Sequence, residues 1–233
     1  MKPVRTAILA LVACGAAALA HADTVIVRAG KMLDVESGQY LADRAIRIED
    51  GRVVSVTPWA ASSRSGDRFI DWSAHTVLPG LIDLHTHLVG DISSADVNAP
   101  LSSSAARDAL MGVEHARATL NAGFTAVRDI GTYRAFVDVA LRNAINARQV
   151  EGPCMFVAGA YVTVPGGGGE VTGLPDALKA PAEMRRGVAE NAEQVRQRVR
   201  ELIAGGADFI KIMATGAVLT AGTTPAMPVS PAW

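Results

Sequence analysis

The sequence has few cysteines, little net charge and no long apolar run outside its first residues. It contains two cysteines, Cys14 and Cys154, and carries a formal net charge of −1. A nearly neutral chain of this kind lacks the basic footprint of a nucleic-acid-binding protein. No apolar run reaches the roughly 20 residues of a transmembrane helix, so we expect no membrane span. With 49% hydrophobic residues, the chain is expected to be globular with a sizeable core.

The first 22 residues have the pattern of an export signal. Lys2 and Arg5 form a basic start, and an apolar stretch follows from Ala7 to Leu19. Ala20-His21-Ala22 then has the small-x-small form of a cleavage site. We therefore expect an exported protein, periplasmic or secreted, whose mature chain begins at Asp23.

The two cysteines are expected to have different fates. Leu11-Val12-Ala13-Cys14 also fits a lipid-attachment box, so a lipoprotein signal is the alternative to cleavage after Ala22. Ordinary cleavage removes Cys14 and leaves Cys154 without a disulfide partner. Because Cys154 precedes an apolar run, we expect it to be a buried small hydrophobe.

Residues 23–76 are predicted to form short strands. The segment 24–34 is the first strand, and the segment 45–56 places alternating apolar residues on both sides of Asp50-Gly51. That pair favours the type I′ turn of a hairpin. A Ser-rich loop at 59–67 precedes a short strand at 69–71.

From Val77 onward, predicted strands alternate with predicted helices, which is the pattern of a parallel α/β architecture. The expected strands cover residues 77–87, 126–130, 155–160 and 209–213, and the expected helices cover 104–121, 134–147 and 182–204. Pro181 and Gly205-Gly206 mark the two ends of the last helix. Residues 220–233 contain three prolines and no periodicity, so an irregular tail is expected.

Two histidines stand at the end of the first of these parallel strands. His85 and His87 are separated by one residue, and residues two apart in a strand point to the same face. Both imidazoles can therefore converge on one metal ion. The alternative is a pair of surface histidines at a strand end.

Lys211 lies within the apolar run Phe209-Ile210-Lys211-Ile212-Met213. Burying an unpaired ammonium costs several kcal/mol, so this setting favours the neutral amine, which can add CO₂ to become a carbamate. The alternative is a lysine that extends its ammonium into water at the end of the strand.

Four segments resemble the amidohydrolase superfamily. Residues 78–88 are similar to its first barrel strand, 24–34 to the opening strand of its small β-sandwich, 123–131 to its second barrel strand and 209–217 to its fourth. The imidazolonepropionase-like and Xaa-Pro or Xaa-Arg dipeptidase branch is the most similar. The resemblance implies an α/β fold, with a β-sandwich segment at 23–76 and the first half of a (β/α)₈ TIM barrel at 77–219. A complete barrel needs roughly 250 residues.

The resemblance also implies a metal site and a reaction. His85 and His87 would hold the catalytic metal, and a carboxylated Lys211 would bridge two ions, most plausibly Zn²⁺. The reaction implied is hydrolysis of a C–N bond in a small molecule, a dipeptide or a cyclic amide.

The histidine content sets a limit on that chemistry. The family completes its site with two later histidines and an aspartate, whereas none of the five histidines here follows the fourth strand: His21, His75, His85, His87 and His115. We therefore expect little or no hydrolysis from this chain by itself. The alternative is a non-catalytic fragment that binds a metal or a partner.

The remaining candidates have two interpretations each. Asp129 ends the second strand, where it would orient a ligand or loop or make an ordinary strand-end hydrogen bond. The run Gly166, Gly167, Gly168 and Gly169 would approach a substrate closely or serve as a flexible connector. His75, in the linker before the first barrel strand, and His115, in a helix, are expected to be structural or exposed to solvent.

Overall fold

The computed structural model describes residues 24–60, 68–90, 99–172, 174, 179–218, 220 and 222–226. The predicted export signal, most of the Ser-rich loop and residues 227–233 of the predicted tail lie outside this range. The chain divides into two compact units, residues 1–79 and 80–233. Within the described residues, no helix is both long enough and apolar enough to cross a membrane.

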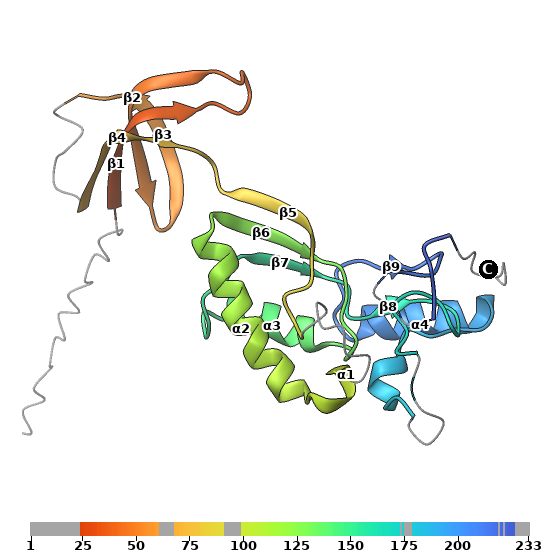
Figure 1. Ribbon diagram of the computed structural model, residues 1–233. Coiled ribbons are helices and arrows are strands. Elements are labelled where there is room, and N and C mark those ends of the chain that lie inside the picture. Colours follow the sequence, from red (N-terminus) through yellow and green to blue (C-terminus); the bar gives the residue numbers. More distant parts are fainter. Residues whose placement is uncertain are drawn as a thin grey trace, which may run out of the picture. The chain divides into compact units, whose positions relative to one another are not determined.

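The N-terminal unit contains one four-stranded sheet with the order β3-β2-β1-β4 (Figure 1). Its strands are β1 (Thr24–Leu33), β2 (Tyr40–Glu49), β3 (Arg52–Pro58) and β4 (Arg68–Val77). β1 pairs antiparallel with β2 and parallel with β4. The predicted hairpin is confirmed, because Asp50 and Gly51 have φ values of 48° and 75° between β2 and β3, as a type I′ turn requires.

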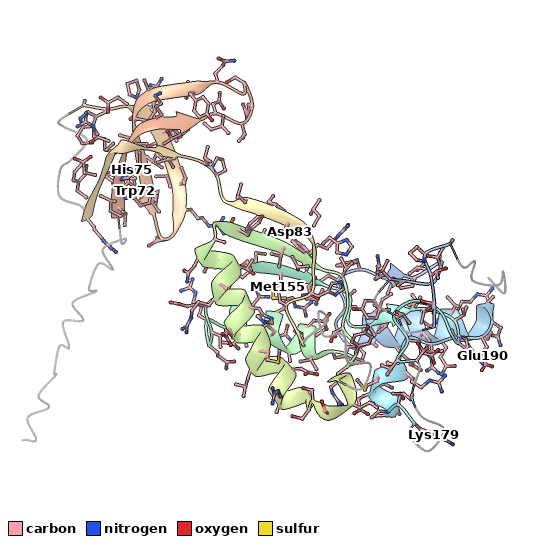
Figure 2. All side chains as sticks on the ribbon, viewed as in Figure 1. Trp72, His75, Asp83, Met155, Lys179 and Glu190 are labelled. Carbon is pink, nitrogen blue, oxygen red and sulfur yellow. The ribbon has the colours of Figure 1, made fainter. Side chains whose placement is uncertain are left out.

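β4 is longer than the sequence indicated. It runs from Arg68 to Val77, because its first five residues and, after a register shift, Thr76 and Val77 pair with β1. Val77, predicted to open the first barrel strand, therefore closes β4. His75 lies on this strand and is exposed, not in a linker (Figure 2).

The second unit begins with three parallel strands in the order β5-β6-β7 and helices packed against one face (Figure 1). The strands are β5 (Leu81–Thr86), β6 (Phe124–Asp129) and β7 (Cys154–Val157). The helices are α1 (Ala99–Ser102), α2 (Ala105–Asn121) and α3 (Val137–Asn146). The predicted helix at 104–121 is confirmed as α2, whose N-cap Ser104 accepts a hydrogen bond from the Arg107 N–H.

The face of the sheet that the helices cover forms the main core. Val127, Met155 and Val157 pack there with Leu141 of α3, and Figure 2 shows Met155 on the helix side of the sheet. Alternate residues of a strand point to opposite faces. Cys154 and Phe156 therefore face away from the helices, and both are exposed. The prediction of a buried Cys154 is wrong because it ignored the phase of this alternation.

A separate two-stranded parallel sheet follows, formed by β8 (Tyr161–Val162) and β9 (Lys211–Ile212). The predicted strand at 155–160 ends early because the chain turns at Gly159, where φ is +76°. The predicted strand at 209–213 is reduced to two residues. β8 was not predicted, although it pairs Tyr161 directly with Lys211.

The predicted helix at 182–204 is wrong in its first half. A 3₁₀ helix, η2, covers Ala182–Arg185, and the α-helix α4 covers only Ala192–Ala204. Between them the backbone pairs with Thr163, which donates its N–H to the Gly187 carbonyl and accepts from the Ala189 N–H at 3.1 and 2.8 Å. This tertiary pairing overrides the local helical pattern.

Candidate metal centre

The two predicted histidines lie at the carboxyl end of β5 and line one cavity with Lys211. The His85 and His87 ring centroids are 5.7 Å apart. The cavity has a volume of about 350 Å³. Its lining consists of His85, His87, Ile130, Tyr133, Tyr161, Gly169, Lys211, Met213, Ala217, Val218 and Thr220. The carboxyl ends of the strands are where (β/α)₈ enzymes place their active sites.

Hydrogen bonding fixes which His87 nitrogen is available to a ligand. Nδ1 lies 2.8 Å from the carbonyl oxygen of Gly131, and a carbonyl oxygen only accepts. Nδ1 therefore carries the hydrogen, and in the neutral ring Nε2 keeps its lone pair. Burial lowers the pKa of His87, and the charges of His85 and Lys211 lower it further, against the Gly131 hydrogen bond, which raises it. The neutral form of His87, which is the form that binds a metal, is therefore favoured.

Leu88, the residue after His87, is held through both its N–H and its carbonyl. Asp129 Oδ2 accepts the Leu88 N–H at 2.6 Å, and His115 Nδ1 donates to the Leu88 carbonyl at 2.9 Å. Asp129 therefore makes a strand-end hydrogen bond to the backbone beside the histidine pair, which was one of its two predicted roles. His115 is half-buried and structural.

Asp129 is fully buried at the end of β6. Burial raises its pKa to about 7, although the Leu88 N–H lowers it, and the nearby Asp138 carboxyl raises it further. Within the described part of the chain its Oδ1 has no hydrogen-bond partner. A neutral carboxyl is the form that such a site favours.

Lys211 and His85 have less enclosed positions. Lys211 opens β9 and is half-buried, so its amine is not sealed in an apolar interior as the sequence alone indicated. His85 is exposed on β5, and its N–H donates to Asp83 Oδ1 at 3.0 Å. Both side chains reach the cavity from different strands.

The glycine run is tied to the neighbouring segment. Gly168 donates its N–H to the Thr215 carbonyl, and Gly169 donates to Thr220 Oγ1, each at 3.0 Å. Among the four predicted glycines, Gly169 lines the cavity, whereas Gly166, Gly167 and Gly168 do not. These bonds show an anchored loop in place of the flexible connector considered from the sequence.

Tyr133 and Tyr161 are site residues that the sequence reasoning missed. They stack edge to face with ring centroids 5.9 Å apart, and the Tyr161 hydroxyl reaches His87. Tyr161 and His87 are 74 residues apart in the sequence. No periodicity or spacing motif could have connected them.

The side chains of the cavity fit part of a zinc site. Zinc takes imidazole and oxygen ligands and is commonly four-coordinate. The cavity offers His85, His87 and a lysine that carboxylation would convert to an oxygen donor. The described residues contain no group of three or more histidine, cysteine, aspartate or glutamate side chains that could hold a metal ion.

Successive parallel βα units with functional side chains at the strands' carboxyl ends define part of a (β/α)₈ barrel, the scaffold of many enzymes. A comparison with protein families identifies which barrel family this is. Residues 76–231 match the Amidohydrolase family, and the chain belongs to this family.

Individual relatives agree with this assignment. The ochratoxinase of Aspergillus niger is 30% identical over 223 residues, which covers 88% of this chain and 45% of the enzyme. The imidazolonepropionase of Saccharopolyspora erythraea is 41% identical over 68 residues, 28% of this chain and 17% of that enzyme. The crystal structure of a Xaa-Pro dipeptidase with bound methionine superimposes with a TM-score of 0.80 at 32% identity, covering 88% of this chain and 50% of that one. The chain thus spans about half the length of these ochratoxinase and dipeptidase relatives, and its fold is that of a partial TIM barrel.

Proposed function

We propose that this amidohydrolase is a metal-dependent hydrolase of C–N bonds in which His85, His87 and Lys211 bind Zn²⁺. The observation that carries the proposal is the hydrogen bond from His87 Nδ1 to Gly131. It leaves Nε2 free as a ligand in the cavity that His85 and Lys211 also line. Bound zinc would supply a Lewis acid and lower the pKa of water at the site.

Carboxylation of Lys211 would complete its role. The neutral amine attacks CO₂, a N–C bond forms, and the displaced proton leaves to solvent. The resulting carbamate carries two oxygens and a negative charge, which suits it to bridge two cations. The half-buried position of Lys211 leaves the amine within reach of dissolved CO₂.

We propose a small amide, a dipeptide or a cyclic amide as the substrate. Ochratoxinase and Xaa-Pro dipeptidase are the names of two similar proteins. Ile130, Tyr133 and Met213 give the cavity an apolar wall next to the histidines, which suits a substrate with an apolar group beside its scissile bond. From the export-signal pattern of the first 22 residues we also propose that this activity lies outside the cytoplasm.

We further propose that these 233 residues alone turn over little substrate. His115 is the last histidine in the sequence, so the two later histidine ligands of the family have no counterpart here. Among the described strands β5 also lies at the edge of its sheet, and its Ile82 and Leu84 are 65% and 59% exposed. A site open to water lacks the preorganised, low-dielectric surroundings that make hydrolysis fast. Metal binding without turnover is therefore the second candidate function.

Lys211→Ala tests the metal site. Zinc content per chain, measured with and without added bicarbonate, is expected to rise with bicarbonate in the unchanged protein and to lose that response in the variant, because the carbamate cannot form. Lys31→Ala, at an exposed lysine of β1, is the matched control and should keep the response. An unchanged zinc content in Lys211→Ala would remove this residue from the site.

An assay of the purified chain with zinc against a panel of dipeptides then separates the two candidate functions. Hydrolysis at the usual enzymatic rates of about 1–10³ s⁻¹ would contradict the expectation of little turnover. Zinc binding without hydrolysis would favour the binding role.

A further inference from the structure

Tyr161 occupies the space between His87 and the glycine-rich loop. Its hydroxyl donates to the Gly131 carbonyl at 3.0 Å, and its Oη lies 3.2 Å from His87 Nδ1. The Tyr161 hydroxyl and His87 Nδ1 therefore both contact the Gly131 carbonyl oxygen. We propose that Tyr161 is a positioning residue that sets the orientation of the His87 ring and links it to the loop at Gly169. This inference rests on the proposed metal site.

The directions of these hydrogen bonds follow from what each atom can do. Gly131 O accepts from both partners, so the Tyr161 hydroxyl uses its one hydrogen there. His87 Nδ1–H then has two acceptors, Gly131 O and Tyr161 Oη. Two acceptors fix both the tautomer and the rotation of the imidazole ring, which aims the unprotonated Nε2. Partners of this kind, one bond removed from a metal, tune ligand orientation and affinity.

Two glycines enclose the Tyr161 ring. A Cβ added to Gly131 would lie 2.9 Å from Tyr161 Cε1, and one added to Gly169 would lie 2.9 Å from Cδ2. Both distances are shorter than real Cβ contacts. The ring therefore keeps its place only while positions 131 and 169 lack side chains.

A third glycine holds the Tyr161 backbone. A Cβ on Gly187 would lie 1.6 Å from the Tyr161 carbonyl oxygen, so the segment after η2 passes directly against β8. The ring is thus confined from the end of β6 and from the glycine-rich loop, and the Tyr161 backbone is confined from the segment before α4. A displacement of the loop at Gly169 would be transmitted to the ring and, through the hydroxyl, to His87.

A purely structural role for Tyr161 makes a different prediction from a positioning role. If the ring only fills space, Tyr161→Phe preserves the packing and leaves His87 unchanged. If the hydroxyl positions the imidazole, the same variant alters His87 while the fold persists.

Long-range ¹H–¹⁵N NMR spectra of the metal-free full chain measure the tautomer of His87. We expect the unchanged protein to show Nδ1–H with unprotonated Nε2, and Tyr161→Phe to keep this tautomer, which the Gly131 carbonyl still fixes, but to shift the His87 ring resonances because Nδ1–H loses its second acceptor. Zinc affinity, measured by competition with a chromophoric chelator, should fall about 10-fold in the variant. Tyr40→Phe is the control, because it removes a tyrosine hydroxyl from the exposed surface of β2, outside the cavity.

Gly169→Ala tests the link to the loop with the hydroxyl intact. Gly169 and Gly166 have φ values of +81° and +73°, so alanine strains the backbone at both positions. A Cβ at 169 meets the Tyr161 ring, whereas a Cβ at 166 meets nothing within 4 Å. We expect Gly169→Ala to shift the His87 resonances and weaken zinc binding, and Gly166→Ala to leave both unchanged.

Unchanged His87 resonances in both Tyr161→Phe and Gly169→Ala would overturn the proposal. So would equal changes in Gly169→Ala and Gly166→Ala, because the effect would then come from backbone strain. The metal-free spectra keep this test separate from the proposed function. If the unchanged protein binds no zinc, the metal site fails while the spectra still decide the role of Tyr161.

Discussion

Replacing His87 with alanine is expected to lower zinc affinity by at least about 100-fold, since loss of a direct ligand should cost no less than the 10–100-fold that loss of a supporting partner costs. Among the cavity side chains, His87 has the most completely fixed surroundings. Its Nδ1–H is bound to Gly131, burial lowers its pKa, and Leu88, the next residue, is held by Asp129 and His115. Chelator competition measures the change.

The control for this variant is His75→Ala. His75 is exposed on β4 of the N-terminal unit and lies outside the cavity, so its removal should leave zinc affinity unchanged. Zinc binding by His87→Ala at the strength of the unchanged protein would contradict the assignment of His87 as a ligand.

Replacing Asp129 with asparagine is expected to make the stability of the fold much less dependent on pH. In the folded protein the pKa of Asp129 is raised from 3.8 to about 7, so the folded state binds a proton that the unfolded chain releases. The free energy of unfolding therefore falls as pH rises through this window. A shift of about three units corresponds to roughly 4 kcal/mol at most.

Asparagine keeps an oxygen for the Leu88 N–H and cannot ionise. Asp129→Asn should thus remove much of the decrease in the free energy of unfolding with rising pH. The decrease that remains should come from Asp138, because burial also raises the pKa of Asp138. Urea unfolding of the metal-free protein at about pH 4.5 and 7.5, two values that enclose most of this pH window, measures the free energy of unfolding. The change between the two pH values is the slope, and it is compared between the unchanged protein and Asp129→Asn. Glu114→Gln, on the exposed side of α2, is the control. An identical slope in Asp129→Asn would show that Asp129 ionises without penalty in the folded state.

The parts of the fold that local sequence determines could be predicted. α2 follows its N-cap Ser104 and ends before Gly123, and the β2–β3 hairpin has the Asp50-Gly51 pair. The wrong burial of Cys154 was a local error in the phase of a strand, whereas the failed helix involves contacts between distant segments. The pairing of Thr163 with Gly187 and Ala189 replaces the first half of a predicted helix, and no local pattern contains that information.

The candidate site also combines features that local sequence predicts with features that depend on distant contacts. The spacing of His85 and His87 and the apolar setting of Lys211 placed three residues that the structure brings to one cavity. The supporting groups were not predictable, because Tyr161 meets His87 and His115 meets Leu88 across 74 and 27 residues. Asp129 was recognised only by its position at a strand end, and its contact with Leu88 needed the register of β5 and β6.

An anomalous diffraction map, recorded at the zinc edge from crystals of the chain grown with zinc and bicarbonate, tests the proposed metal site most directly. We expect an anomalous peak in the cavity, bound by His85, by His87 through Nε2 and by a carboxylated Lys211. A peak bound instead at His75 or His115, with none in the cavity, would contradict it.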